Sequence, residues 1–330
     1  ELREGNRSIF SRVLAQSLHD CVAAGHQAIL FLNRRGASSI VQCRDCGHTL
    51  RCRRCDLPLT YHAQSERLLC HQCNYRLNSP RACPQCHGSR IRYLGLGTQR
   101  VMEEVEQAFP GVKAIRWDRD TVSARGAHES IMESFERGDA QVLVGTQMIA
   151  KGLHFPNVTV VGVLCADIGL FMPDFRAGER VFQLLCQVAG RTGRGPLGGQ
   201  GIVQTYSPNH YAVAAASAQD YNEFYRKEMS YREEQELPPF GRLVHLVYVH
   251  TNEDRCRQEA LRFGGALKRQ RDVWGFTGVD ILGPAPAYPP RLRGRYRWHV
   301  ILRGRDPVFL LEKTPIPQGW TVDIDPISVT

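Results

Sequence analysis

The chain has 330 residues, enough for two or three domains with hydrophobic cores of their own, and a formal net charge of +9 with a pI of about 9.1. Excess positive charge suits a polyanionic partner such as nucleic acid. No apolar run approaches the roughly 20 residues of a membrane-spanning helix, and Glu1-Leu-Arg-Glu-Gly5 does not look like a signal peptide. Because the chain begins without Met, we expect it to be part of a longer protein.

The first predicted elements are a helix and a buried strand. Residues 8–24 begin with a possible N-cap, Ser8, carry apolar residues at helical spacing, and are followed by Gly25, which can end the helix. Residues 27–33 form a continuous apolar run, typical of a strand buried on both faces of a parallel sheet. The turn after it, which contains Arg34, fits either a solvated loop or a contact to phosphate.

Four C-x-x-C pairs lie in the next block. They comprise Cys43, Cys46, Cys52, Cys55, Cys70, Cys73, Cys83 and Cys86. Each pair can place two thiolates on one metal ion through a tight turn, and two pairs complete a closed tetrahedral site. The block therefore predicts two structural zinc ions in a reducing compartment, since disulfides would need an oxidising one. With so few apolar residues in the block, the metal must supply most of its folding free energy.

Spacing alone leaves the pairing of these cysteines open. Residues 56–69, fourteen in number, separate the two inner pairs, close to the zinc-ribbon spacing of about 15 to 20. This favours a nested pairing, with Cys52, Cys55, Cys70 and Cys73 on one ion and the outer four cysteines on the other. A sequential pairing, first four and last four, is the alternative. Eight thiolates fill both sites, so we expect the nearby histidines to be exposed and not to be ligands; these are His48, His62, His71 and His87.

The chain then returns to alternating strands and helices. Gly97-Thr98 begins a helix that we expect over residues 101–109, and a helix N-terminus favours phosphate oxygens. A strand over 112–117 and a helix over 129–138 follow. Two further buried strands are predicted at 141–144 and 158–164, with Thr146 at the turn after the first of them.

A helix beginning near Phe182 leads into Gln187-Val-Ala-Gly-Arg191-Thr-Gly-Arg194-Gly195. Arg191 and Arg194 are three residues apart, hence on one helical face, and suit a phosphate clamp. The blocks GTQMIAKGLHFPNV from Gly145 and QVAGRTGRG from Gln187 resemble motifs V and VI of superfamily-two helicases. With DFRAGER from Asp174 and AILFLNRRG from Ala28, similar to motif IV, they resemble the PriA family of replication restart helicases (primosomal protein N-prime).

The resemblance implies a role for individual residues. Arg191 and Arg194 would act as arginine fingers on a transferring phosphoryl group, Arg194 more directly, with Gln187 and Gly152 completing the catalytic set. Single-stranded DNA would be followed through its phosphates by Arg34, Thr98, Thr146 and Lys151. The family pattern also implies the nested cysteine pairing.

The last third of the chain predicts a separate domain. After a helical, polar segment at 208–236, strands at 243–250, 280–282, 297–302 and 320–324 alternate with helices at 254–271 and 307–312. The order βαββαβ predicts a split ferredoxin-like sandwich. GPAPA from Gly283, LRGRYRWH from Leu292 and DIDP from Asp323 resemble the family's C-terminal domain. Arg295 and Arg297 alternate with rings and are candidate DNA contacts, although such rings can equally pack inward.

The sequence lacks GxxxxGK[ST] and has no Asp-Glu-x-His after a strand. Because a P-loop grips the triphosphate and its Mg²⁺ in this class of motor, we expect ATP and Mg²⁺ to bind only in the complete protein, and the 330 residues alone to be inactive.

The sequence thus predicts an α/β fold: a RecA-like helicase lobe (1–41 and 91–207) interrupted by a two-zinc cysteine-rich insert (42–90), then a linker helix and an α+β ferredoxin-like C-terminal domain (208–330). The expected function is ATP-dependent 3′-to-5′ unwinding at stalled forks and primosome assembly, in the bacterial cytoplasm and associated with the nucleoid. Expected partners are forked and single-stranded DNA, single-strand DNA-binding protein, and primosome and helicase-loading proteins, with no membrane. The alternatives are a non-catalytic fork-binding scaffold and a zinc-ribbon RNA or transcription module, which would not need motif VI.

Overall fold

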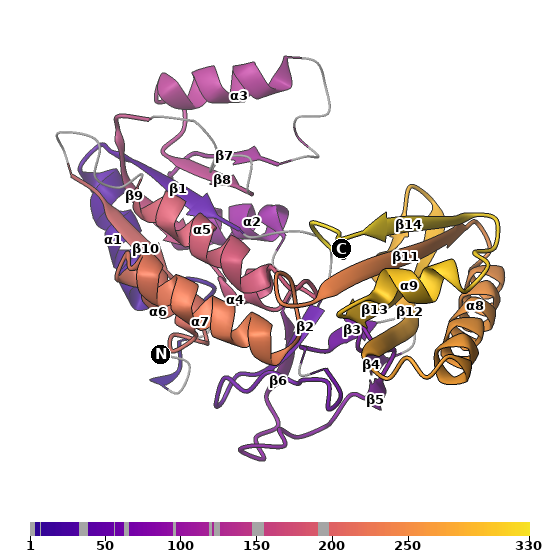
Figure 1. The fold of residues 1–330 in the computed structure, drawn as a ribbon. Helices are drawn as coiled ribbons and strands as arrows, with labels where there is room; N and C mark the ends of the chain where they lie inside the picture. The colour runs from indigo at the N-terminus through magenta and orange to yellow at the C-terminus, as the bar shows by residue number, and fades with distance from the viewer. Residues whose placement is uncertain are drawn as a thin grey trace.

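The computed structural model describes residues 4–6, 8–32, 39–55, 57–62, 66–94, 97–118, 121, 126–146, 155–190 and 198–330. Three sheets organise these residues, and each is the centre of one body in Figure 1. Among the described residues, none of the helices is both long and apolar enough to cross a bilayer.

A parallel five-stranded sheet forms the first body. Its strands, in spatial order, are β10 (Gln200–Val203), β9 (Val158–Val163), β1 (Gln27–Phe31), β8 (Val142–Gly145) and β7 (Ala114–Trp117). Its helices are α1 (Arg12–Ala23), α2 (Thr98–Ala108), α3 (Ala127–Glu136), α4 (Asp167–Leu170), α5 (Ala177–Ala189), α6 (Tyr211–Ser217) and α7 (Tyr221–Glu234).

Helices cover both faces of this sheet, so its strands are apolar on both sides. Leu30 and Val144 pack with α1 and α2, whereas Phe31 and Leu143 pack with α3, α5, α6 and α7. The predicted strands and the order of the helices are therefore confirmed. Most boundaries in this body shift by one to three residues. The two largest shifts are at α1, whose N-cap is Ser11 with its side chain accepting from the Leu14 N–H, and at α5, which begins at Ala177 instead of near Phe182.

The second body is an antiparallel sheet inserted between β1 and α2. Its strands, in spatial order, are β5 (Arg76–Asn78), β4 (Arg67–Leu69), β3 (Thr60–His62), β2 (Ser39–Cys43) and β6 (Ile91–Leu94). The chain enters along β2 and leaves along β6, which pair with each other, as Cys43 with Ile91. The core of this module is small, with Val41, Leu50, Leu59 and Leu68 at its centre.

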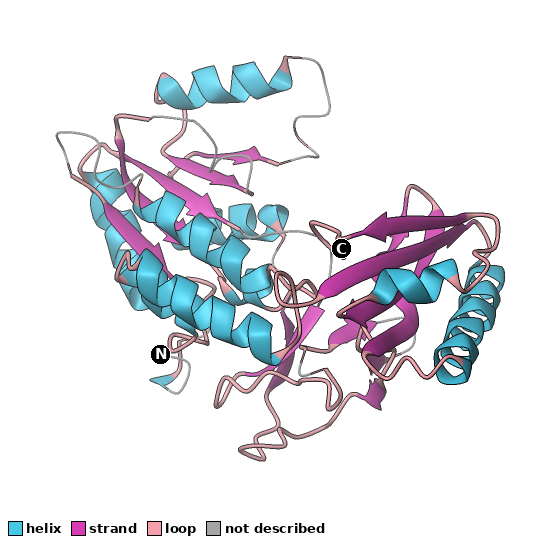
Figure 2. Cartoon of the chain, in the orientation of Figure 1, coloured by secondary structure: helices cyan, strands magenta, loops and turns pink. Residues whose placement is uncertain are grey.

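The third body has the predicted ferredoxin-like order. Its strands, in spatial order, are β12 (Val279–Leu292), β13 (Arg295–Gly304), β11 (Arg242–His250) and β14 (Trp320–Ile324), and its helices are α8 (Glu253–Val273) and α9 (Pro307–Glu312). Both helices lie on one side of the sheet (Figure 2). Strand β12 is far longer than the predicted 280–282, because it is an edge strand and an edge tolerates prolines such as Pro286 and Pro289.

Candidate metal centres and nucleic-acid interface

All four C-x-x-C pairs fold into the same tight turn. The first cysteine of each pair donates its backbone N–H to the carbonyl five residues later: Cys43 to His48, Cys52 to Leu57, Cys70 to Tyr75 and Cys83 to Gly88. Where the residue after the second cysteine is described, it has a positive φ; these residues are Gly47, Asn74 and His87. This backbone aims both sulfurs of a pair to the same side, as a shared metal ion requires.

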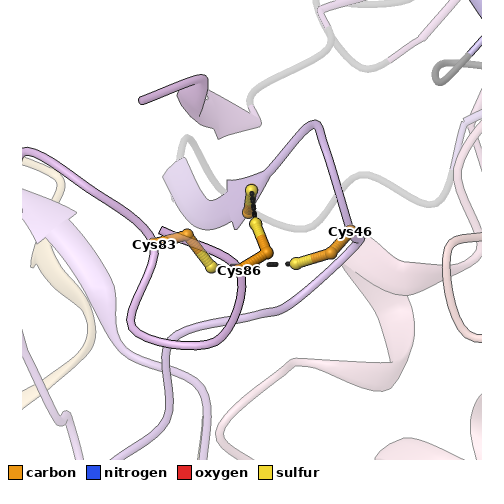
Figure 3. A group of neighbouring side chains, drawn as sticks. Cys46, Cys83 and Cys86 are labelled. Carbon is orange, nitrogen blue, oxygen red and sulfur yellow. Dashed lines mark hydrogen bonds between the residues drawn. The ribbon is translucent and has the colours of Figure 1, made fainter. Parts of the chain in front are cut away.

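The sulfurs gather in two groups of four. One group is Cys43, Cys46, Cys83 and Cys86, and the other is Cys52, Cys55, Cys70 and Cys73; within each, the ligand atoms lie within 4.8 Å of one another. Figure 3 shows the sulfurs of Cys46, Cys83 and Cys86 pointing together. The nested pairing is thus confirmed, and the sequential alternative is wrong.

The spacing of the sulfurs fits zinc. Four sulfurs at about 2.3 Å from a tetrahedral ion lie about 3.8 Å apart. The observed distances are 3.6 Å between Cys43 and Cys86, 3.7 Å between Cys46 and Cys83, and 3.5 Å between Cys52 and Cys73. A disulfide would need about 2.05 Å, and all of these cysteines are free. The donor set and the geometry therefore match a structural four-cysteine zinc site.

Crowded thiols need a cation to ionise together. Hydrogen bonds from Cys70 and Cys73 raise the pKa of Cys55, whereas hydrogen bonds from Cys55 and Cys70 lower the pKa of Cys73 to about 2. The neighbouring thiols thus favour one thiolate, on Cys73, and oppose a second one, on Cys55. A divalent ion removes this conflict because its charge favours all four thiolates at once.

The histidines of this module belong to neither group of sulfurs. His62 and His71 instead contact each other, with their Nε2 atoms 3.2 Å apart. His71 is buried, which corrects the expectation that it is exposed. Burial lowers the pKa of His71 to about 3, so its ring is neutral at pH 7.

The expected motor residues fall only partly within the described part of the chain. Thr146 directly follows β8 and is half-buried there. Arg34, Lys151, Gly152, Arg191 and Arg194 lie outside the described residues. Gln187 is exposed on α5, and this helix ends at Ala189 with Gly190 as its C-cap, directly before Arg191. The carboxyl edge of an open α/β sheet is where such folds bind ligands.

Thr98 does not offer its hydroxyl to solvent. The side chain is buried, and its Oγ1 donates to the carboxylate of Asp118, just beyond the end of β7. Asp118 also accepts from the Thr121 N–H at 3.1 Å and lies 3.5 Å from the Arg116 guanidinium. The expected phosphate contact through the Thr98 side chain therefore has no support from this geometry, which uses the hydroxyl to join α2 to β7.

Arg295 and Arg297 differ in solvent exposure and in hydrogen bonding. Arg295 is exposed at the start of β13, as a phosphate contact requires. Arg297 is half-buried, and its Nη1 donates to the carbonyls of Tyr288 and Pro289 at 3.3 Å each. Near Arg295, the guanidinium of Arg291 lies over the ring of Tyr296, 5.1 Å from its centroid.

Two carboxylates, the buried Asp174 before α5 and the half-buried Glu179 in its first turn, were not identified from the sequence. The Oδ2 of Asp174 accepts from Arg180 at 3.2 Å, from the Ser328 hydroxyl at 2.5 Å and from the Thr330 hydroxyl at 3.3 Å. Glu179 binds Arg176 at 2.5 Å and Arg232 at 2.8 Å. Arg176 is the main reason that the pKa of Glu179 falls to about 2. Both acids belong to the DFRAGER block, which was the available signal.

Family models match the chain in three successive segments. They are the PriA DNA helicase Cys-rich region domain over residues 52–77, the helicase conserved C-terminal domain over 98–196 and the primosomal protein N C-terminal domain over 233–327. The chain matches the C-terminal portion of the PriA family. The PriA Cys-rich region model covers the group of Cys52, Cys55, Cys70 and Cys73, which supports structural zinc.

Curated PriA relatives align along nearly all of the chain. The replication restart protein PriA of Bacillus subtilis is 46% identical over 305 residues, which are 92% of this chain and 37% of that protein. PriA of Synechocystis is 41% identical over 100% of the chain and 40% of its own length, and PriA of Treponema pallidum is 40% identical over 97% and 50%. The chain therefore spans half or less of the length of these relatives.

Proposed function

We propose that this chain supplies the second motor lobe, the zinc insert and the C-terminal domain of an ATP-dependent 3′-to-5′ DNA helicase that restarts replication at stalled forks. The observation that carries the proposal is the succession within one chain of a helicase lobe, a PriA-type cysteine-rich insert and a PriA C-terminal domain. The domain limits of 1–41 with 91–207, 42–90 and 208–330 belong to this proposal; β2 and β6 extend a few residues beyond the insert limits.

The roles that we propose for the motor residues depend on where α5 ends. Because α5 ends directly before Arg191, Arg191 and Arg194 would face a nucleotide held by a P-loop lobe, where they would stabilise charge on the transferring phosphoryl group. Thr146, Lys151 and Arg34 would follow one DNA strand by its phosphates, which needs no base sequence. ATP and Mg²⁺ would bind with that P-loop lobe, since the 330 residues contain no P-loop.

The partners and location are part of the same proposal. Forked and single-stranded DNA are the substrates, and single-strand DNA-binding protein, primosome proteins and helicase-loading proteins are the protein partners. A bacterial cytoplasmic protein at the nucleoid would meet all of them. The net charge of +9 favours the nucleic-acid part of this set.

ATP hydrolysis and fork binding, measured on the same zinc-loaded chain, test the proposal. We expect the 330-residue chain to bind forked DNA without ATP turnover. In a longer chain that also carries a P-loop lobe, Arg194→Ala should abolish turnover and leave fork affinity intact. Turnover by the 330 residues alone, or full activity of Arg194→Ala, would contradict the assigned half-motor.

The two arginines of β13 give a second test with a matched pair. Arg295→Ala should weaken DNA binding and reduce the salt slope of log K by about one, because one exposed phosphate contact is lost. Arg297→Ala should instead increase hydrogen exchange in β12, whose carbonyls it holds. Fork affinity as a function of salt concentration, with exchange measured on both variants, checks this. If both variants weakened fork binding equally and neither changed hydrogen exchange in β12, the two arginines would not have the different roles proposed here.

The alternative is a non-catalytic fork-binding primosome scaffold. The absence of a P-loop from these 330 residues favours it as the second candidate. A scaffold would bind forks and partners identically in the presence and absence of ATP, even in a longer chain. The Arg194→Ala variant separates the two, since a scaffold does not depend on an arginine finger.

A further inference from the structure

The C-terminal sheet has a second buried face. Along β13, Val300 and Leu302 pack under the helices α8 and α9, while His299 and Ile301 alternate to the opposite side. His245 of β11 lies on that opposite side as well. A two-layer sandwich alone would leave this side in water, yet His299 is 3% and His245 is 5% exposed.

The turn between Cys70 and Cys73 covers the His299 part of this face, while Phe175 of the parallel-sheet body packs against the cluster that contains Ile301. His71 lies inside the turn, and its backbone carbonyl accepts from His299 Nε2 at 2.5 Å. The His71 ring donates from Nδ1 to the carbonyl of Pro286 on β12 at 2.9 Å, and its edge packs on Tyr288 with the ring centroids 5.5 Å apart. One residue of a metal-binding turn therefore holds both strands of the β12–β13 hairpin.

The bonding partners fix one arrangement of protons. Carbonyls only accept, so His299 must carry its proton on Nε2 and His71 on Nδ1. The remaining nitrogen of each ring is then an acceptor: His299 Nδ1 accepts from His245 Nε2 at 2.9 Å, and His71 Nε2 accepts from His62 Nε2 at 3.2 Å. This arrangement keeps His299 and His71 as neutral imidazoles with both ring nitrogens bonded. If the turn left, His299 would face the opened interface without its acceptor.

The other cysteine group touches a different body. Gly47, next to Cys46, lies against Tyr206 of the parallel-sheet body, where an added Cβ would be 3.7 Å from the Tyr206 carbonyl oxygen. The turn that contacts β12 and β13 belongs instead to the group of Cys52, Cys55, Cys70 and Cys73. Arg51, next to Cys52, also lies over the ring of Phe171 in the parallel-sheet body. What distinguishes the inner group is therefore its bond to the C-terminal sheet.

We propose that this inner cysteine group is the docking element for the C-terminal domain. Zinc on these four thiolates holds the Cys70–Cys73 turn in the shape that presents the His71 carbonyl and ring, and the C-terminal sheet binds that turn through His299 and Pro286. Loss of the inner ion releases the His299 part of the sheet face from the insert, while the domain stays folded and Ser328 and Thr330 keep their bonds to Asp174. Loss of the outer ion leaves it docked.

Histidine modification by diethyl pyrocarbonate, read by mass spectrometry on the full 330-residue chain, tests the proposal. His19, with a side chain 69% exposed, is the internal reference. In zinc-loaded protein we expect His245 and His299 to be protected. In Cys73→Ala, with one zinc per chain, both should react at the level of His19 while the amides of α8 stay protected from hydrogen exchange.

Two variants keep the test decisive. Cys83→Ala removes an outer ligand and also leaves one zinc, so His245 and His299 should stay protected. His71→Leu retains all eight cysteines and both ions but removes the bond to Pro286, and we expect His299 to become reactive in it. Protection that persists in Cys73→Ala and His71→Leu, or exposure that is equal in Cys73→Ala and Cys83→Ala, would overturn the proposal. The result does not depend on DNA or ATP.

Discussion

A buried partner decides what a polar side chain can do. Thr98 has the residue type and the position of a phosphate contact at a helix N-terminus, but Asp118 takes its hydroxyl. Arg297 has the charge of a DNA contact, but two backbone carbonyls take its guanidinium. In both cases the side chain stabilises the protein at the surface where a ligand was expected.

Thr98→Val should therefore act on stability. The substitution leaves a buried carboxylate with one donor fewer, which costs about 1–3 kcal/mol. Native-state hydrogen exchange should show this loss in α2 and β7. Thr321→Val, at an exposed position of β14, is the matched control and should change little. Unaltered exchange together with weaker binding of single-stranded DNA would restore Thr98 as a direct DNA contact.

At the scale of elements, helix α5 is anchored at its first turn, the end that is farther along the sequence from Arg191 and Arg194. Glu179 in its first turn pairs with Arg232 of α7, whose guanidinium also lies 2.7 Å from Glu228. The ring of Phe182 stacks on Phe224, with the centroids 4.0 Å apart. These contacts fix the first half of α5 against α7.

Glu179→Gln should loosen this anchor. Removing one partner from a fully buried ion pair costs about 3–5 kcal/mol; solvent reaches part of this pair, so we expect about 2 kcal/mol. Opening free energies from hydrogen exchange in α5 and α7 measure the effect. Glu223→Gln is the control, since its pair with Arg226 is exposed and worth about 0.5 kcal/mol. If the two variants behaved alike, the Glu179 pair would be no anchor.

Local pattern predicted much of this molecule, and long-range contact explains the rest. The buried strands and the ferredoxin-like order are visible in apolar runs, and the zinc ligands in the C-x-x-C spacing, which favours their nested pairing without fixing it. Glu179 in the first turn of α5 binds Arg232, 53 residues away, and the His71 carbonyl accepts from His299, 228 residues away. The sequence around Glu179 or His71 does not indicate the distant residue that each contacts, so such pairs cannot be predicted from local sequence.

At the scale of the whole molecule, the zinc insert and the motor sheet have separate cores. The insert buries few side chains around Val41 and Leu68, whereas the motor sheet has two large clusters of its own. A strong chelator should therefore abolish exchange protection over residues 41–94 and leave that of β1 and β9 intact. Zinc analysis with hydrogen exchange checks this. An insert that stayed protected after metal loss would mean that its apolar core suffices.

The position of β1 in the sequence has a consequence for folding during protein synthesis. This central strand pairs with β8 and β9, as Ala28 with Val142 and Ile29 with Val161, so both of its neighbours are translated long after it. The zinc insert follows β1 directly and has all of its strands by Leu94. On the ribosome, a metal-loaded module can therefore fold behind an apolar strand that has no sheet yet. That strand is exposed to chaperones and to aggregation until β9 emerges.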